Sequence, residues 1–242
     1  MIRGTNPDRV AAMSSVTVLS VGGSIVVPDG VDVPFLRELV ALFRSHLEAD
    51  AERRLVLVVG GGSAARAWQS AARTVREGLT SDELDRIGIA ATRLNAEVVR
   101  TAFADLCTAP VFTDPADAGA LTGRVVIGGG WKPGFSTDNV AVHAAQSVGA
   151  STLINLSNIR QIYTADPKID SSARPLKSIR WEDLFAIVGD EWIPGANTPF
   201  DPVATRKAAE LGMTVIAADG RDLENLRSLL AGKSFVGTTI AP

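Results

Sequence analysis

Short apolar runs that stop at glycines and then lead into helical segments recur along this chain. The runs VTVLSV (16–21), RLVLVV (54–59) and RVVI (124–127) are mostly apolar, which is typical of strands buried on both faces. Strands separated by helices pair in parallel, because each helix carries the chain back across the sheet. The pattern therefore predicts an α/β fold with a mainly parallel sheet that helices cover on both faces.

The remaining segments extend this alternation over most of the chain. We expect further strands at 110–113, 151–156, 213–218 and 236–240, and helices at 34–48, 64–78, 82–105, from 137 onward, and at 181–189, 203–212 and 221–232. Residues 159–179 carry turn signals and alternation, which predict a hairpin-like excursion, and a loop is expected at 192–202. Residues 1–15 are polar, and we expect a short flexible tail there before one domain at 16–242.

The composition is that of an ordinary globular protein and argues against several classes of partner. Hydrophobic residues make up 46% of the 242 residues and charged residues 21%, which argues against a disordered chain. The formal net charge is -3, and no run of Lys and Arg interleaves with aromatic residues, so nucleic acid is not expected as a partner. No apolar stretch reaches the roughly 18 residues that span a membrane, and the first 15 residues lack a signal-peptide core. We therefore expect a cytoplasmic protein that does not bind a membrane.

Side chains that mark disulfides or zinc sites are scarce in this sequence. Cys107 is the one cysteine, which excludes an internal disulfide and suggests a reducing compartment, and we expect its thiol to be buried and inert. His46 and His143 lie far apart without a Cys or His partner at ligand spacing, so a zinc site is not expected. A metal held by phosphates and carboxylates stays open, because such a site needs no histidine.

Three glycine loops give the first indication of what the protein binds. They occupy 22–24, 60–63 and 128–138, each between an expected strand and an expected helix. Free N–H groups at a helix start favour anions, and glycine lets the backbone approach a phosphate closely. Because ligands of parallel sheets bind at the carboxyl ends of the strands, the three loops predict two phosphate-bearing ligands side by side.

Two other nucleotide-binding motifs fail in this sequence. Gly232-Lys233-Ser234 resembles the end of a P-loop, but Arg227 stands where that motif requires its first glycine. The tripeptide also follows a helical segment, whereas a P-loop follows a strand. The dinucleotide fingerprint G-x-G-x-x-G is absent from the glycine loops, so a nicotinamide-dependent enzyme is not expected.

Six segments, in their order along the chain, resemble the amino-acid kinase superfamily. They are VLSVGGSIV, VVGGGSAAR, LDRIGIAATRLNAEV, GGGWKPGFSTDNVA, NIRQIYTADP and FDPVATRKAAELG, and the similarity around them runs from about Val16 to Ile240. Within the superfamily, the chain is most similar to the UMP kinases, particularly those of the archaeal type. The resemblance implies a three-layer αβα sandwich, a homo-oligomer that is commonly a hexamer, and transfer of the γ-phosphate of ATP to UMP with Mg²⁺.

The resemblance implies an acceptor site built from the second and third glycine loops. The residues that it assigns to UMP are Gly61, Gly62, Arg66, Asp85, Ser136, Thr137 and Asp138. The two glycines and Arg66 would hold the phosphate, Asp85 the ribose hydroxyls, and the Ser-Thr-Asp cluster the acceptor and the transferred phosphate. Simpler interpretations stay open. Arg66 is also explained as a solvated arginine on a helix face, and Asp85 as one charge of an acidic helix start. The Ser-Thr-Asp cluster is also explained as a helix N-cap, which is compatible with binding.

The resemblance also implies a donor site for ATP. The residues that it assigns to ATP are Gly22, Gly23, Ser24, Asn158, Tyr163, Asp166 and Pro167. The frame N-x-x-x-x-Y-x-x-D-P would hold adenine and ribose, although a Tyr-x-x-Asp-Pro segment alone would be only a turn. Asp201 matches a carboxylate that orients the reacting groups and the metal in relatives, and its alternative is a helix cap before Pro202. No metal-ligand set of the protein is expected, because the phosphates of ATP would hold most of the Mg²⁺ coordination.

Cations that relatives commonly use are missing from this chain. Ser20 stands where many relatives have a lysine, and the segment 191–202 contains none. Arg160-Gln161 replaces the usual Asp-Gly after the asparagine of the donor frame. Phosphoryl transfer needs cations near the developing charge, so Lys132 is the first candidate and Arg160 the second, although either is as well explained as a solvated surface residue. The expected catalytic residues are Lys132, Asp138 and Asp201.

Two further functions stay open on the sequence alone. One is a kinase of the same superfamily with a carboxylate, a carbamate or isopentenyl phosphate as its acceptor. Ser63-Ala64-Ala65 stands where isopentenyl phosphate kinases place a histidine, and Asp85 with the TRLNA segment points to a ribose instead of an amino acid. The other is a nucleotide-binding oligomer without turnover, a regulator or a storage shell, as in the molybdenum storage protein of this superfamily. The missing lysines and the Arg160-Gln161 replacement keep this second alternative open.

Overall fold

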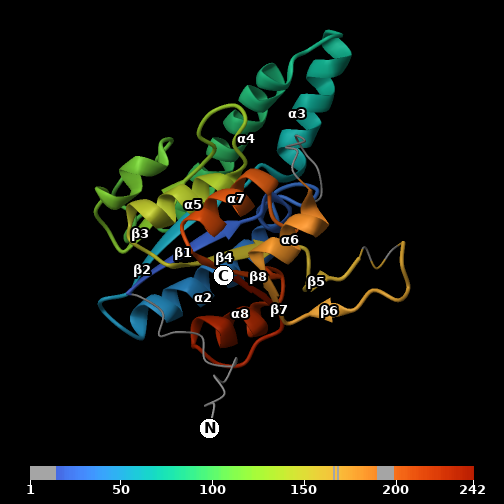
Figure 1. Ribbon diagram of the computed structural model, residues 1–242. Helices are drawn as coiled ribbons and strands as arrows, with labels where there is room; N and C mark the ends of the chain where they lie inside the picture. The colour runs from blue at the N-terminus through green and yellow to red at the C-terminus, as the bar shows by residue number, and fades with distance from the viewer. Residues whose placement is uncertain (1–14, 166, 168, 190–198) are drawn as a thin grey trace.

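A seven-stranded sheet forms the centre of the molecule (Figure 1). The computed structural model describes residues 15–165, 167, 169–189 and 199–242. In sheet order, the strands are β3 (Val125–Gly128), β2 (Arg54–Val59), β1 (Val16–Val21), β4 (Thr152–Ser157), β8 (Thr214–Asp219), β9 (Thr238–Ala241) and β7 (Ser178–Arg180). The first five strands pair in parallel, whereas β9 runs antiparallel to β8 and parallel to β7. The expected mainly parallel α/β sheet is confirmed.

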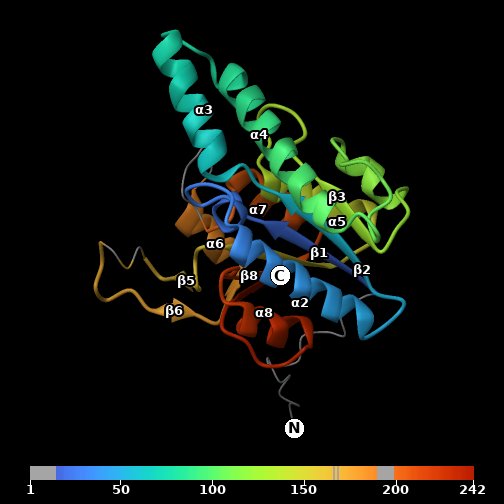
Figure 2. The same cartoon turned by 180° about the vertical axis from the view of Figure 1, so that it is seen from behind.

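Helices cover both faces of the sheet and complete three layers (Figures 1 and 2). One face carries α2 (Val33–Glu48), α4 (Ser81–Ala102) and α8 (Leu223–Leu230), and the other carries η1 (Pro115–Gly119), α5 (Thr137–Ser147), α6 (Trp181–Val188) and α7 (Pro202–Glu210). Side chains of a strand point alternately to the two faces, so Leu55 and Leu57 join one core while Val56 and Val58 join the other. The expected αβα sandwich is confirmed.

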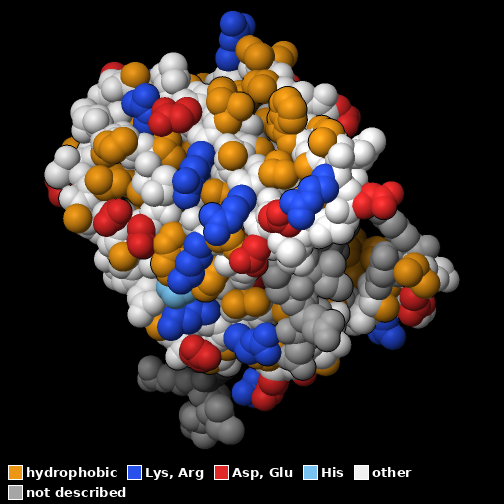
Figure 3. Space-filling view, turned by 90° about the horizontal axis from the view of Figure 1, so that it is seen from above, with side chains coloured by type: hydrophobic (Ala, Val, Ile, Leu, Met, Phe, Trp, Pro, Cys, Tyr) orange, Lys and Arg blue, Asp and Glu red, His pale blue; other side chains and the backbone are white. Residues whose placement is uncertain are grey.

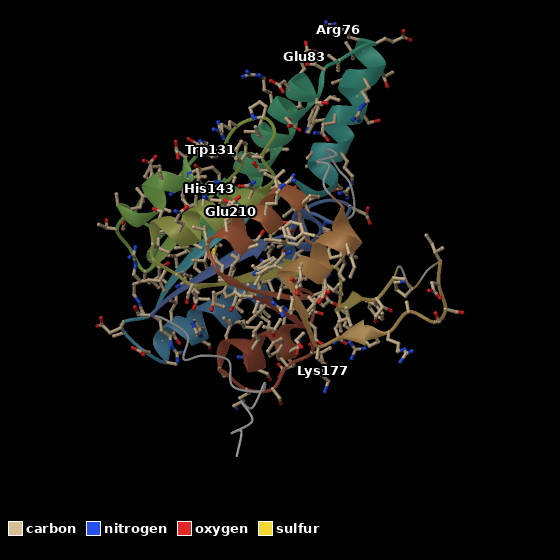
Figure 4. All side chains as sticks on the ribbon, in the orientation of Figure 1. Arg76, Glu83, Trp131, His143, Lys177 and Glu210 are labelled. Atoms are coloured by element: carbon tan, nitrogen blue, oxygen red, sulfur yellow. The ribbon has the colours of Figure 1, made fainter. Side chains whose placement is uncertain are left out.

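Two further helices begin at the first two glycine loops, α1 (Gly23–Val26) and α3 (Gly62–Val75). The helix α3 and the first part of α4 project beyond the sheet in both ribbon views (Figures 1 and 2). Seen from above, hydrophobic side chains reach the surface among Lys and Arg side chains (Figure 3). An ion pair between Arg76 and Glu83, 2.9 Å from Nη1 to Oε1, joins the end of α3 to the start of α4 (Figure 4). No helix of the described residues is long and apolar enough to cross a membrane.

The expected strand at 110–113 is wrong. In this segment, Phe112 forms an isolated parallel bridge to Gly128 and no named strand is present. Pro110 has no N–H to donate to a ladder, and the chain turns into η1 at Pro115, so only Phe112 of this segment pairs with β3.

The segment expected as a hairpin contributes to two sheets. The hairpin is confirmed, because β5 (Ile162–Tyr163) pairs antiparallel with β6 (Pro175–Leu176) outside the main sheet. The residues that follow it form β7, which pairs with β9 and becomes an edge of the main sheet. The expected loop at 192–202 lies largely outside the described residues, as does the expected tail at 1–15 apart from its last residue.

Candidate active site

The first two glycine loops lie against each other at the carboxyl ends of β1 and β2. Val21 pairs with Val59 in the parallel register, so the chain leaves both strands at the same level of the sheet. A Cβ atom on Gly23 would collide with the amide nitrogen of Gly62, and a Cβ on Gly60 would collide with the amide nitrogen of Gly23. Gly62 also has a φ of 60°, a conformation that glycine adopts at least cost. Backbone contact between the loops therefore requires glycine at these positions.

Several amides at the two loops are free to bind an anion. The Gly22 amide donates to the Leu156 carbonyl oxygen at 2.8 Å, which ties the first loop to β4. In the part of the chain that the structure describes, no hydrogen bond is donated by the amides of Gly23, Ser24, Gly61 or Gly62. Free amides at the start of a helix are the arrangement that phosphate groups favour.

The helix α4 holds both the second and the third glycine loops through buried polar side chains. Asn95, which is 4% exposed, donates from Nδ2 to the carbonyl oxygens of Gly60 at 2.9 Å and Gly61 at 3.0 Å. The Thr92 hydroxyl accepts from the Gly130 amide at 2.7 Å, and Arg93 donates to the Gly130 carbonyl oxygen at 3.0 Å. The TRLNA segment, which the sequence associated with a ribose, thus positions the loops themselves.

Asp85 faces the third glycine loop. Its Oδ2 accepts from the Gly134 amide at 2.8 Å, and Gly134 has a φ of 81°. The start of α4 is stabilised by other side chains, because Thr80 and Glu83 form a reciprocal capping box. Asp85 lies one turn further along α4, so its carboxylate does not cap the helix and instead contacts the Gly134 amide.

Arg66 lies in the first turns of α3, after the second glycine loop. Its side chain is exposed, and no hydrogen bond or ion pair joins it to another described residue. A free guanidinium beside free loop amides suits a phosphate, because it can donate two parallel hydrogen bonds to the oxygens.

Ser20, Asp138 and Asp201 meet behind the glycine loops, although they come from β1, α5 and the start of α7. The Ser20 hydroxyl donates to Oδ1 of Asp138 at 2.8 Å, and the charge of Asp138 acts on the Asp201 carboxyl group. Asp201 caps α7, because its Oδ1 accepts from the Ala204 amide at 2.6 Å. Asp201 therefore caps α7 and also lies beside Asp138.

Both carboxyl groups are shifted towards their protonated forms. Burial raises the pKa of Asp138, against the hydrogen bonds from Ser20 and from the Asp201 amide, which lower it. Burial raises the pKa of Asp201 to about 6; the hydrogen bond from the Ala204 amide opposes this shift, and the charge of Asp138 adds to it. Among the described residues, no group of three or more His, Cys, Asp or Glu side chains is arranged to hold a metal ion.

The third glycine loop ends in a capped helix and carries Lys132 on an aromatic cluster. The Ser136 hydroxyl accepts from the Asn139 amide at 3.1 Å, so Ser136 is the N-cap of α5 and Thr137 its first residue. The Lys132 amine lies 3.9 Å from the ring centre of Trp131 and 4.7 Å from that of Phe135. The same cluster includes His143, whose ring centre lies 5.6 Å from that of Trp131 (Figure 4).

No contact joins Lys132 to the carboxylate pair of Asp138 and Asp201. Its amine instead makes cation–π contacts with the aromatic cluster, and its side chain is exposed. The sequence grouped Lys132 with Asp138 and Asp201 as catalytic residues. In this structure, Lys132 contacts Trp131 and Phe135 and not the two carboxylates.

The residues that the sequence assigned to adenosine lie around the hairpin. Asn158 and Pro167 are exposed, Tyr163 is half-buried in β5, and Asp166 lies outside the described residues. Arg160 is exposed as well, whereas its neighbour Gln161 donates from Nε2 to the Gly237 carbonyl oxygen at 3.1 Å. This hydrogen bond ties the base of the hairpin to the segment before β9.

A known protein family matches most of this chain. The family model described as "Amino acid kinase family" matches residues 15–219, which include all the glycine loops and the carboxylate pair. The chain belongs to the amino acid kinase family.

Individual members of this family resemble the chain over nearly its whole length. It is 36% identical over 228 residues to a uridylate kinase of Methanospirillum hungatei, covering 92% of this chain and 93% of that protein. It is 35% identical to a uridylate kinase of Methanocorpusculum labreanum, with 92% and 94% covered. The crystal structure of the uridylate kinase of Archaeoglobus fulgidus superposes with a TM-score of 0.79 at 33% identity, covering 93% and 99% of the two chains.

The sequence reasoning missed the side chains that support this amino acid kinase site. Asn95 and Thr92 were quoted only as part of a motif, and Ser20 only as the replacement of a lysine. A detectable signal was present for the helix residues, because polar side chains on the buried face of an amphipathic helix need hydrogen-bond partners. The bond of Ser20 to Asp138 spans 118 positions, and no local pattern indicates such a contact.

Proposed function

We propose that the protein is a uridylate kinase that transfers the γ-phosphate of ATP to UMP and forms UDP and ADP. The observation that carries the proposal is the pair of touching glycine loops with free amides, next to the carboxylate pair of Asp138 and Asp201. Two such loops can hold two phosphate chains side by side, as transfer between nucleotides requires. The likeness to uridylate kinases over more than nine tenths of the chain supports uridine as the acceptor nucleoside.

The acceptor half of the site would be formed by α3, α4 and the third glycine loop. Gly61, Gly62 and Arg66 would bind the phosphate of UMP through amides and a guanidinium, none of which is engaged by a described residue. Asp85 would accept from the ribose hydroxyls through Oδ1, while its Oδ2 keeps the Gly134 amide. The bound nucleotide would then lie against both α4 and the third loop.

The donor half of the site would begin at the first glycine loop. The amides of Gly23 and Ser24 would bind phosphates of ATP, and Gly22 would fix the loop through its bond to β4. Asn158 and Tyr163 would contact adenine and ribose, together with Pro167 and with Asp166, which lies outside the described residues.

The transfer itself needs alignment more than a protein nucleophile. A phosphate oxygen of UMP would attack the γ-phosphorus of ATP, and the bond to the β-phosphate oxygen would break, releasing ADP. No phosphorylated enzyme intermediate is expected. Mg²⁺ bound with ATP would offset the charge of the transferred phosphoryl group. Lys132 remains the proposed additional cation, and it would have to leave Trp131 to reach the phosphates.

We further propose that the protein assembles into a homo-oligomer, with a hexamer as the expected form. Large apolar side chains are exposed on the projecting helices, Trp68 and Leu94 at 64% and Val75 at 87%. Apolar side chains grouped on projecting helices favour contact with other copies of the chain.

We also propose that the protein is cytoplasmic, which agrees with ATP and UMP as its proposed substrates.

The direct test is release of ADP from ATP and Mg²⁺ in the presence of UMP, CMP, dTMP, AMP or isopentenyl phosphate. Turnover with UMP and little with the other acceptors is expected. Turnover with isopentenyl phosphate alone would replace the proposed acceptor. Tight ATP binding without turnover on any acceptor would favour the non-catalytic nucleotide-binding oligomer, which Ser20 in the place of a lysine keeps open.

A matched pair of variants tests the acceptor nucleoside. Asp85→Asn is expected to raise the KM for UMP and leave the KM for ATP unchanged, because it removes a charged acceptor for ribose hydroxyls. Asp82→Asn, an exposed carboxylate in the first turn of the same helix, is the control and should change neither value. Equal effects of the two substitutions would contradict the role of Asp85.

A further inference from the structure

The hairpin of β5 and β6 has little support of its own. Its strands have two residues each, and in both ribbon views it projects from the body of the molecule (Figures 1 and 2). Pro175, which pairs with Tyr163, has no N–H to donate to the other strand. Two-stranded hairpins are marginally stable in water, so a fixed position of this hairpin requires contacts with the rest of the fold.

A threonine of the last strand joins both strands of the hairpin. Thr238 of β9 is fully buried. Its hydroxyl accepts from the Ile162 amide at 2.9 Å and donates to the Leu176 carbonyl oxygen at 2.6 Å. Ile162 and Leu176 are directly paired residues of β5 and β6, so one side chain holds both strands at the base of the hairpin. An apolar side chain of the same shape could not do this, because only a hydroxyl accepts and donates at once.

The strand that carries Thr238 is fixed in the main sheet. It pairs with β8 on one side and with β7 on the other. Just before β9, Val236 exchanges two hydrogen bonds of 2.7 Å with the Asn225 side chain of α8. A Cβ atom on Gly237 would lie 2.7 Å from the Ala217 carbonyl oxygen, so the chain enters β9 in close contact with β8. The sheet therefore fixes the Thr238 hydroxyl and, through it, the base of the hairpin.

We propose that Thr238 is a positioning residue for the ATP site and acts through this hairpin. The inference rests on the proposed function, in which Tyr163 contacts adenine and ribose. Tyr163 directly follows Ile162, so a hairpin that moves at Ile162 also moves Tyr163. Only molecules with the hairpin in place would bind ATP tightly, and the apparent affinity for ATP falls with the fraction of such molecules.

The acceptor half of the proposed site shares no element with this contact. The residues proposed for UMP lie on α3, α4, α5 and the loops before them, whereas Thr238 joins β9 to β5 and β6. A release of the hairpin should therefore weaken binding of ATP and leave binding of UMP unchanged. A general loss of stability would affect both nucleotides, so the two affinities separate positioning from a merely structural role.

Calorimetric binding of ATP with Mg²⁺, and of UMP in a separate titration, to the full chain tests the proposal. Thr238→Val removes the hydroxyl and should raise the Kd for ATP at least about fivefold, the scale of one lost hydrogen bond. The Kd for UMP should change less than about twofold. Thr238→Ser keeps the hydroxyl and should bring the Kd for ATP back to within about twofold of the wild type.

The neighbouring threonine supplies the control. The side chain of Thr239 points to the opposite face of β9, because successive side chains of a strand alternate. Its contact with the segment after the hairpin is made by the main chain, whose amide donates to the Lys177 carbonyl oxygen at 2.9 Å. Thr239→Val keeps this bond and should change neither Kd.

Hydrogen exchange shows whether the hairpin itself is released. The Ile162 amide should exchange at least about fivefold faster in Thr238→Val than in the wild type, because its buried acceptor is lost. In Thr238→Ser and in Thr239→Val, this amide should exchange at close to the rate of the wild type.

The outcomes distinguish this role of Thr238 from the proposed reaction. An unchanged Kd for ATP in Thr238→Val, an equal loss of ATP and UMP binding, or unchanged exchange at Ile162 would overturn the proposal even if UMP is phosphorylated. Absence of ATP binding by the wild type would overturn it as well. Weaker ATP binding and faster exchange in Thr238→Val alone would support it. That result would stand even if the wild type released no ADP with UMP, in which case only the proposed transfer would fail.

Discussion

Replacing Asn95 with leucine tests whether α4 holds the second glycine loop. The change keeps the approximate shape of the side chain but removes both hydrogen bonds to the carbonyl oxygens of Gly60 and Gly61. At about 1 kcal/mol for each buried bond, the free energy of unfolding should fall by about 2 kcal/mol. A loss of this size lowers the ratio of folded to unfolded protein by about 30-fold. The KM for UMP should rise as well, because Gly61 belongs to the proposed phosphate site.

Urea unfolding of the variant and the wild type measures this loss of stability. Thr101→Ala is the control on the same helix, because the Thr101 hydroxyl is exposed and bonds only the Glu97 carbonyl oxygen of its own helix. The control should change the free energy of unfolding by less than about 0.5 kcal/mol. If Asn95→Leu unfolds at the same urea concentration as the control, the two hydrogen bonds do not hold the loop.

Three further substitutions have separate readouts. Gly62→Ala should lower the melting temperature and weaken UMP binding, because a Cβ there would collide with the Gly23 carbonyl oxygen at a φ of 60°; calorimetry that shows no change would contradict the loop contact. Arg66→Ala should raise the KM for UMP at least about tenfold, as expected for a lost charged hydrogen bond, while Arg73→Ala on the same helix should not. Burial lowers the pKa of His46 to about 4, so its neutral form is favoured in the folded state. The free energy of unfolding of the wild type should therefore fall between about pH 6.5 and pH 4 relative to His46→Gln, and parallel pH profiles in urea would refute this assignment.

The sequence was sufficient for the sheet wherever a strand is buried on both faces. The runs at 16–21 and 54–59 match β1 and β2, because each consists largely of residues that can only be placed inside. It was insufficient where pairing depends on distant residues. The segment around Phe112 has the local composition of a strand but forms only an isolated bridge. The short strand β7 becomes an edge of the sheet only because β9 passes beside it.

The site divides in the same way between local and distant information. The glycine loops were predictable, because their position after buried strands is a local pattern. Their support by Asn95 and the bond from Ser20 to Asp138 join segments 34 and 118 positions apart, which spacing along one chain does not reveal. Lys132 was expected at the phosphates from its place in a loop, whereas its contacts with Trp131 and Phe135 depend on the side-chain conformation.

The contact between the first two glycine loops makes the floor beneath the two proposed phosphate sites out of main chain alone. The distance between the two loops follows from the spacing of neighbouring strands, about 4.8 Å, and no rotamer or change of protonation alters it. The separation of the two phosphate chains is therefore inherited from the register of β1 and β2, in which Val21 lies opposite Val59. Engineering of a new acceptor would have to proceed at the nucleoside end of the pocket, because at the phosphate end any added side chain would push the two ligands apart.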